Sequence, residues 1–181
     1  MRYGKSGLIL FYMTYINLLD LLFPKICLGC KSCGSYLCES CFKKIALESR
    51  QSCPACGRKN ISGTFCGNKC RKDFYFDQLI TCMIYDKTSF LKKLIALFKY
   101  KFSEELSEVF GKILVKQFKK LRNLIPDSGS GLILIPVPLH KKRLKFRGFN
   151  QAQLLADYLT KNINGIDVHD FLERKIYTKE Q

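Results

Sequence analysis

The chain has 181 residues, of which 47% are hydrophobic and 13% aromatic. A chain of this length can bury a hydrophobic core, and its composition excludes an intrinsically disordered or a fibrous protein. Its formal net charge of +16 would attract polyanions such as nucleic acids. A basic composition that only keeps the protein soluble would explain the charge equally well.

The first 23 residues combine a basic start with an apolar run. The run from Gly7 to Phe23 imitates a secretory signal, but Asn17 and Asp20 interrupt it and no small-x-small cleavage site follows. The run is also shorter than the ~20 residues that a membrane-spanning helix needs. Its apolar residues recur at helical spacing, which predicts an amphipathic helix over residues 1–23 that packs on the body of the protein. Binding to a membrane surface is the alternative, and we expect neither secretion nor stable membrane insertion.

Nine of the ten cysteines lie between Cys27 and Cys70. Two cysteines separated by two or three residues can bend around one tetrahedral ion, and a second pair completes the coordination. The region therefore predicts one or two structural zinc ions, although the spacing does not say which pairs share an ion. The predicted ligands are Cys27, Cys30, Cys38, Cys41, Cys53, Cys56, Cys66 and Cys70.

A disulfide framework is the alternative for these cysteines. Without a secretion signal we expect a reducing, cytoplasmic compartment, which favours metal. Four sulfur ligands leave no open position for water, so zinc-assisted hydrolysis is not expected. Two cysteines remain outside the pairs. Cys82 is interpreted as a small core residue, and the spacing leaves open whether Cys33 replaces a neighbouring cysteine as a ligand.

Several elements are predicted after the cysteines. Residues 74–85 are rich in aromatic and β-branched types and predict one or two strands. A helix is predicted from Thr88, and a second from Ser103, each with one apolar face. The sequence PDSGSG at 126–131 then breaks the chain.

The remaining residues predict an α/β unit. Residues 132–135 read as a buried strand, residues 140–147 as a basic loop, residues 149–161 as a helix and residues 168–172 as a short strand. This order is typical of a parallel α/β unit. In open α/β sheets ligands bind beyond the carboxyl ends of the strands, which is where the basic loop falls.

The motifs of the chain are, in order, LLFPKICLGC, LCESC, CPACG, LIALFKYK and IPVPLHKKRLKFRGFNQAQLLA. In this combination they resemble the ComF family of bacterial competence proteins, from about Leu18 to Gln181. The resemblance implies a zinc-ribbon domain, here a double zinc ribbon at 24–72, followed by an incomplete α/β domain like the type I phosphoribosyltransferases at 73–181. It also implies a role in handling single-stranded DNA during natural competence and DNA uptake, with competence-machinery proteins as further partners.

The resemblance further implies a phosphate site. The sequence PVPLH would correspond to the pyrophosphate loop of type I phosphoribosyltransferases. Arginines there would pair with phosphate oxygens, and the polar residues that begin the next helix would orient the ligand. A simple turn and helix cap is the alternative. The phosphate-binding residues implied are His140, Arg143, Arg147, Asn150 and Gln151.

One motif of the type I enzymes is missing. Their phosphoribosyl-pyrophosphate loop has two adjacent acidic residues followed by Thr-Thr-Gly, and the only adjacent acids here are Glu104 and Glu105, in a predicted helix. We therefore expect a chain truncated before this loop, with phosphoribosyl pyrophosphate bound only by a complete chain and no transfer reaction by this chain alone.

Two other functions remain open. One is a non-enzymatic, zinc-dependent nucleic-acid-binding module, in which Tyr36, Phe42 and Phe65 would stack on unpaired bases. The other is an inactive fragment of a longer phosphoribosyltransferase.

Overall fold

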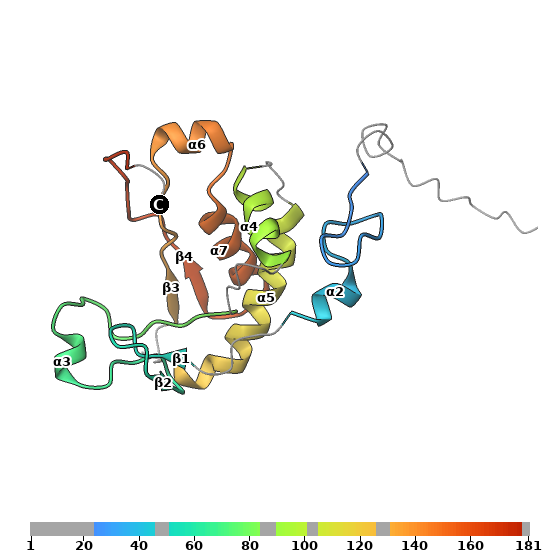
Figure 1. Cartoon of the computed structure of the whole chain (residues 1–181). Coiled ribbons are helices and arrows are strands. Elements are labelled where there is room, and N and C mark those ends of the chain that lie inside the picture. The colour runs from blue at the N-terminus through green and yellow to red at the C-terminus, as the bar shows by residue number, and fades with distance from the viewer. Residues whose placement is uncertain (1–23, 46–50, 84–89, 101–104, 126–130, 179–181) are drawn as a thin grey trace, which may run out of the picture.

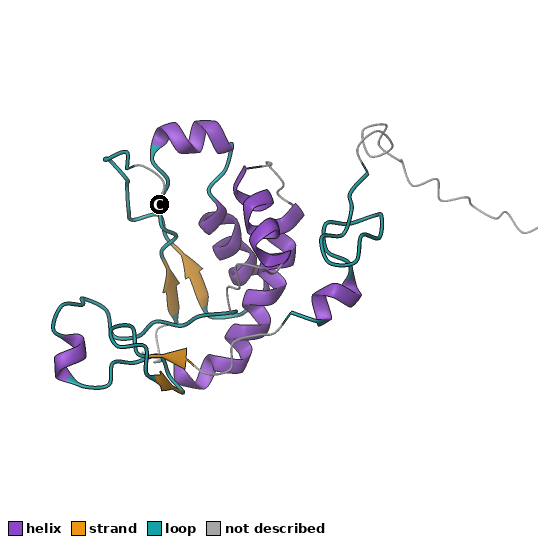
Figure 2. Ribbon diagram, viewed as in Figure 1, coloured by secondary structure: helices purple, strands orange, loops and turns teal. Residues whose placement is uncertain are grey.

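The computed structural model describes residues 24–45, 51–83, 90–100, 105–125 and 131–178 (Figure 1). The amphipathic helix predicted over residues 1–23 lies outside the described residues. The described part combines cysteine-rich ribbons, several helices and a two-stranded parallel sheet (Figure 2). None of its helices is long and apolar enough to cross a membrane.

The cysteine-rich ribbons contain only short regular elements. In the first ribbon α2 (Glu39–Lys43) begins after Cys38. In the second, β1 (Gln51–Ser52) pairs antiparallel with β2 (Lys59–Asn60), and α3 (Asn68–Arg71) follows. Strands of two residues are too short to be stable alone, so the ribbons depend on contacts other than their backbone ladders.

The two predicted amphipathic helices are confirmed. They are α4 (Phe90–Tyr100) and α5 (Glu105–Leu121), and the 3-10 helix η1 (Arg122–Leu124) continues from the second. Each helix buries one face because apolar residues recur every three or four positions. The buried apolar residues of these faces are Leu91, Leu94, Phe98, Leu106, Phe110, Ile113 and Leu121.

The α/β unit at the end of the described chain is also confirmed. It consists of β3 (Leu132–Leu134), α6 (Lys141–Arg147), α7 (Gln151–Asn162) and β4 (Ile166–Val168). The strands β3 and β4 pair in parallel. Strand β4 begins at Ile166, two residues before the start of the strand predicted at 168–172.

The prediction of a basic loop at residues 140–147 is wrong, because these residues form α6. The helix has a cap at each end: the Nδ1 atom of His140 accepts a hydrogen bond from the N–H of Lys142 at 3.2 Å, and Gly148 takes a left-handed φ of 79°. Glycine adopts this conformation without a Cβ clash. Lys, Arg and Leu favour helix, so two caps are sufficient for a helix of this length inside a folded protein.

The prediction of strands at residues 74–85 is wrong for its described part, which contains no strand and only the isolated bridge residues Gln78 and Met83, of which Gln78 pairs with Thr64. The rings of Phe74 and Phe76 pack on each other and on Phe65 instead, while Tyr75 is fully exposed. The ring of Phe65 lies 5.1 Å from that of Phe74 and 5.5 Å from that of Phe76, measured between centroids. These residues therefore cover the second ribbon rather than a sheet face.

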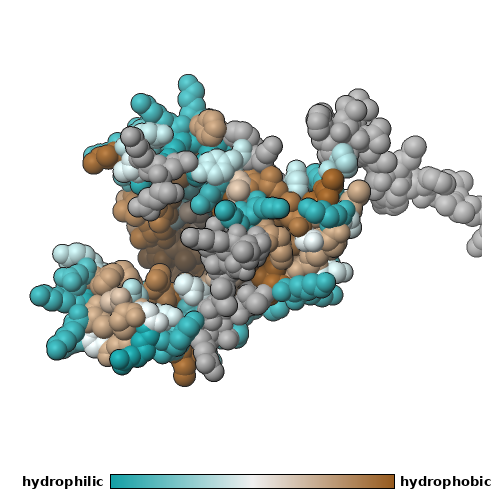
Figure 3. Space-filling model, in the orientation of Figure 1, coloured by the Kyte–Doolittle hydropathy of each residue, from teal (hydrophilic) through white to brown (hydrophobic). Residues whose placement is uncertain are grey.

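The hydrophobic core joins the first ribbon to the helices. Cys27 and Cys41 of the ribbon belong to the same buried cluster as residues of α4 and α5. On its other side α5 packs against α7. The chain at and after β3 is open by contrast, because Ile133 in β3 and Ile135 and Val137 beyond its end are 57%, 44% and 66% exposed (Figure 3).

The close approach of α5 and α7 depends on a glycine. A Cβ added at Gly111 would lie 2.4 Å from ring atoms of Tyr158 in α7. We expect Gly111→Ala to lower the free energy of unfolding by about 1 to 3 kcal/mol, and so the melting temperature by about 2 to 4 °C per kcal/mol. Thermal melting followed by circular dichroism measures the change.

Gly67→Ala is the matched control, because a Cβ there meets nothing within 4 Å. Equal melting temperatures for the two variants would show that the Gly111 contact is not a constraint.

Candidate zinc centres and a basic surface

The first ribbon brings four cysteines together. The Sγ atoms of Cys27, Cys30, Cys38 and Cys41 all lie within 4.8 Å of one another, and those of Cys30 and Cys38 are 3.5 Å apart. Four sulfurs at about 2.3 Å from a tetrahedral zinc ion stand about 3.8 Å from each other. The residues of this cluster, named here the first cysteine cluster, therefore fit a zinc ion.

Burial and hydrogen bonds act in opposite directions on these thiols. Burial disfavours the thiolate of Cys27, but the N–H groups of Cys38, Cys30 and Gly29 point at its sulfur and lower its pKa to about 6. The N–H of Cys38 lies 3.4 Å from that sulfur. Burial and the neighbouring sulfurs raise the pKa of Cys41 to about 12. A divalent cation would relieve the repulsion between these sulfurs, as zinc–thiolate sites require.

The second ribbon brings three cysteines equally close. The Sγ atoms of Cys53, Cys56 and Cys66 lie within 4.8 Å of one another, with 3.7 Å between Cys56 and Cys66. Cys70 in α3 lies outside this limit, and burial and the sulfurs of Cys56 and Cys53 raise its pKa. Gly57 closes the turn with a φ of 72°, a left-handed conformation that glycine adopts without a Cβ clash. We call these four residues the second cysteine cluster.

The two remaining cysteines stand apart from both clusters. Cys33 is exposed and forms an isolated bridge with Ile26. Cys82 is half-buried, and burial raises the pKa of its thiol.

The residues predicted to bind phosphate lie around α6 and the start of α7. His140 caps α6 through its ring, and Asn150 caps α7 by accepting a hydrogen bond from the N–H of Ala152 at 3.1 Å. Asn150 also donates to the carbonyl of Val137 at 3.2 Å. The amide of Gln151 donates to the carbonyl of Phe98 at 3.3 Å. The polar side chains of this group are therefore already bonded within the protein.

The two arginines of that prediction differ in exposure. Arg147 is buried, with its guanidinium 5.1 Å from the ring centroid of Tyr100 and 3.4 Å from the amide oxygen of Gln151. Arg143 is half-buried and donates from Nη2 to the carbonyl of Thr178 at 2.6 Å. Its Nε is buried and has no acceptor in the described part of the chain.

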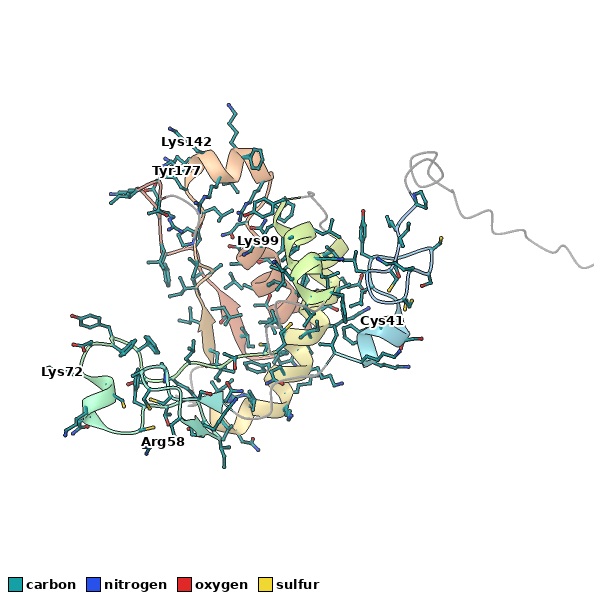
Figure 4. All side chains as sticks on the ribbon, in the orientation of Figure 1. Cys41, Arg58, Lys72, Lys99, Lys142 and Tyr177 are labelled. Carbon is teal, nitrogen blue, oxygen red and sulfur yellow. The ribbon has the colours of Figure 1, made fainter. Side chains whose placement is uncertain are left out.

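The structure also shows a surface that the sequence reading missed. Helix α4 carries three Lys or Arg residues and α6 carries five, and neither helix contains Asp or Glu. The end of α4 meets the end of α6, where Arg147 lies over Tyr100. Figure 4 shows Lys142 beside Tyr177 at α6, with Lys99 between α6 and α4. We name this the α4–α6 basic surface; its exposed lysines are Lys92, Lys93, Lys99, Lys141, Lys142 and Lys145.

Exposed aromatic rings lie on the same surface. Tyr100, Phe146 and Tyr177 are 42%, 64% and 51% exposed. Two of the aromatics named from the sequence as stacking residues, Tyr36 and Phe42, instead pack against the core. The sequence contained one sign of the α4–α6 basic surface. Lys92 and Lys99 are seven residues apart, which puts both on one face of a helix.

Comparisons with known proteins agree with the cysteine geometry. Residues 18–71 match the double zinc ribbon domain. The chain is 30% identical over 127 residues to competence protein ComFC of Bacillus subtilis, covering 68% of this chain and 51% of that protein. It is 27% identical over 150 residues to competence protein F of Haemophilus influenzae, covering 80% and 62%. The chain thus spans about half to three fifths of these relatives, and no solved structure matches it.

The domain match and the cysteine clusters together indicate structural zinc. Each cluster has the sulfur donors that zinc prefers.

Replacing a buried ligand tests the first cluster. Cys41→Ser puts a poorer zinc ligand at a position that is only 4% exposed, so we expect the loss of one zinc ion per chain and about 3 kcal/mol of stability. Elemental analysis of the purified protein and chemical denaturation measure the two quantities. The control is Cys33→Ser, which should keep both values, and an unchanged zinc content in Cys41→Ser would contradict the assignment.

Proposed function

The chain belongs to the ComF family, and on this premise we propose that it acts in natural competence by binding single-stranded DNA. The α4–α6 basic surface is the observation that supports this function best. The double zinc ribbon has a structural role in the proposal, and the names of the two relatives supply the link to competence.

Charge and aromatic rings together favour a single strand. The surface has exposed lysines on two helices, and the helices themselves contain no carboxylate that would repel a phosphate backbone. The ion pair of Lys141 with Glu173, at 3.1 Å, uses one of these lysines. Tyr100, Phe146 and Tyr177 expose rings among the cations. Proteins that bind single strands without sequence preference combine these two features, because phosphates need cations and unpaired bases stack on rings.

The organisation that we propose has a double zinc ribbon at residues 24–72 and a domain related to type I phosphoribosyltransferases at residues 73–181. The parallel pairing of β3 with β4 through intervening helices is consistent with such a domain. The first ribbon packs into the helical core, so it would move as one body with α4 and α5.

A phosphate site at α6 is the second candidate function. The buried Nε of Arg143, without an acceptor among the described residues, favours it because a guanidinium can offer Nε and Nη to two oxygens of one phosphate. Arg143 also lies beyond the carboxyl end of β3, the usual ligand position in α/β sheets. The ligand would be pyrophosphate or the pyrophosphate group of phosphoribosyl pyrophosphate.

The triple variant Lys99→Gln, Lys142→Gln, Lys145→Gln tests the DNA surface. Removing three phosphate contacts should make the dependence of log affinity on log salt less steep by about 2, since each contact with a single strand contributes about 0.7. Fluorescence anisotropy with a labelled oligothymidine over a salt series gives both slopes.

The matched control removes three exposed lysines of α5, as Lys116→Gln, Lys119→Gln, Lys120→Gln. It should keep the slope of the unmodified protein. Equal slopes for all three proteins, or no binding of oligothymidine by the unmodified chain, would refute the α4–α6 basic surface as the DNA site.

The phosphate site is tested with Arg143→Lys. Lysine keeps the charge but loses the paired N–H groups, so the affinity for pyrophosphate should fall by about tenfold. Isothermal titration calorimetry with pyrophosphate measures it. Arg58→Lys, in the second ribbon, is the control, and equal affinities for both variants would assign pyrophosphate binding to general charge.

A further inference from the structure

The two cysteine clusters differ in their relation to the hydrophobic core. In the first cluster Cys27 is 0% and Cys41 4% exposed, and both contribute to the buried cluster that contains Leu94 and Phe98 of α4. The packing around these sulfurs is tight, since a Cβ added at Gly29 would lie 2.6 Å from the Sγ of Cys41. Separating these cysteines therefore means opening the core.

The second cluster lies at the surface. Cys53 is buried, but Cys56 and Cys66 are exposed and Cys70 is half-buried. A surface hollow of about 490 Å³ is lined by residues 66–70, so it includes two of the four cysteines. Solvent and a small chelating molecule can thus reach the sulfurs of this cluster directly.

The second ribbon is joined to the helices by polar contacts that do not include its cysteines. The amide oxygen of Gln51 accepts from the N–H of Thr81 at 2.7 Å and from its hydroxyl at 3.1 Å, while its nitrogen donates to the carbonyl of Thr81 at 3.2 Å. The amide of Gln117 in α5 donates to the same carbonyl at 3.3 Å. Gln78 donates to the carbonyl of Leu124 in η1 at 2.9 Å.

The second ribbon also has a small apolar core of its own. The rings of Phe65, Phe74 and Phe76 pack on one another, with 5.5 Å between the centroids of the last two. No residue of this aromatic group belongs to the buried cluster that holds α4 and α5 among the described residues. Disorder in the metal knuckles of the second ribbon would therefore leave that cluster in place.

From these differences we infer that the two zinc centres are unequal, and that a chelator removes zinc from the second cluster while the helical body stays folded. The first zinc is part of the core, and its loss unfolds α4 and α5. The second is an exchangeable zinc, so the conformation of the second ribbon depends on the available zinc concentration. This inference is independent of the proposed binding of DNA and pyrophosphate.

The experiment is a titration of the zinc-loaded full chain with EDTA. Native mass spectrometry counts the bound ions, far-ultraviolet circular dichroism reports the helices, and alkylation by iodoacetamide followed by peptide mapping identifies the freed cysteines. We expect one zinc to leave at constant helical signal, with alkylation at Cys53, Cys56, Cys66 and Cys70. The second zinc should leave only together with the helical signal.

A pair of matched variants separates the two centres without a chelator. Cys30 and Cys56 are both exposed members of their clusters, so replacing either by Ser causes no large change in packing of its own. Cys56→Ser should lose one zinc and keep the helical melting transition, whereas Cys30→Ser should lose one zinc and lower that transition.

Several results would overturn the inference. They are a loss of helical signal with the first zinc, first alkylation at Cys27, Cys30, Cys38 or Cys41, or equal melting temperatures for the two variants. A chain that binds a single zinc would also decide the question. Alkylation that spares the cysteines of the first cluster would place the zinc there and support the inference. Alkylation that spares the cysteines of the second cluster would refute it.

Discussion

The burial of two zinc-ligand cysteines inside the helical core is the interaction on which the described structure depends. Cys27 and Cys41 pack with residues of α4 and α5, so the core is incomplete without the first ribbon. Thiolates are costly to bury alone, and the N–H groups aimed at Cys27 offset part of that cost. A metal ion shared by four sulfurs would offset the remainder. With a zinc ion at the first cysteine cluster, folding and metal binding in this region would be a single equilibrium.

The attachment of the second ribbon follows a different principle. Gln51 and Gln117 are 1% and 0% exposed, yet both are polar. Both meet the backbone of Thr81, which supplies a donor and an acceptor in fixed positions. Hydrogen bonds of this kind are directional, so they set the orientation of the second ribbon more strictly than apolar contact would. The cost of burying the amide of Gln51 is limited because both its oxygen and its nitrogen have partners at Thr81.

The sequence was informative where a feature depends on local spacing. The sequence predicted the cysteine pairs, the apolar faces of α4 and α5, and the parallel order of β3 and β4. Aromatic and β-branched residues at 74–83 gave the wrong prediction because their partners are other rings of the same ribbon, which a strand pattern cannot reveal. Which cysteine pairs share a cluster was equally hidden, because every pair has similar spacing and only the tertiary fold brings two pairs together.

The basic stretch of α6 shows why a charge count could not define the site. In a loop the five cationic side chains of this stretch would be equivalent. In a helix of 3.6 residues per turn they are divided between two faces. Arg143 and Arg147, four residues apart, turn toward the protein, where one meets Thr178 and the other Tyr100 and Gln151. The lysines at 141, 142 and 145 remain exposed. Burying the arginines and exposing the lysines suits the chemistry of each side chain. A guanidinium is weakly hydrated and stacks on rings, whereas an ammonium is strongly hydrated. In the two functions proposed above, the same stretch would hold one anion at its inner face through Arg143 and attract a phosphate backbone at its outer face through the lysines.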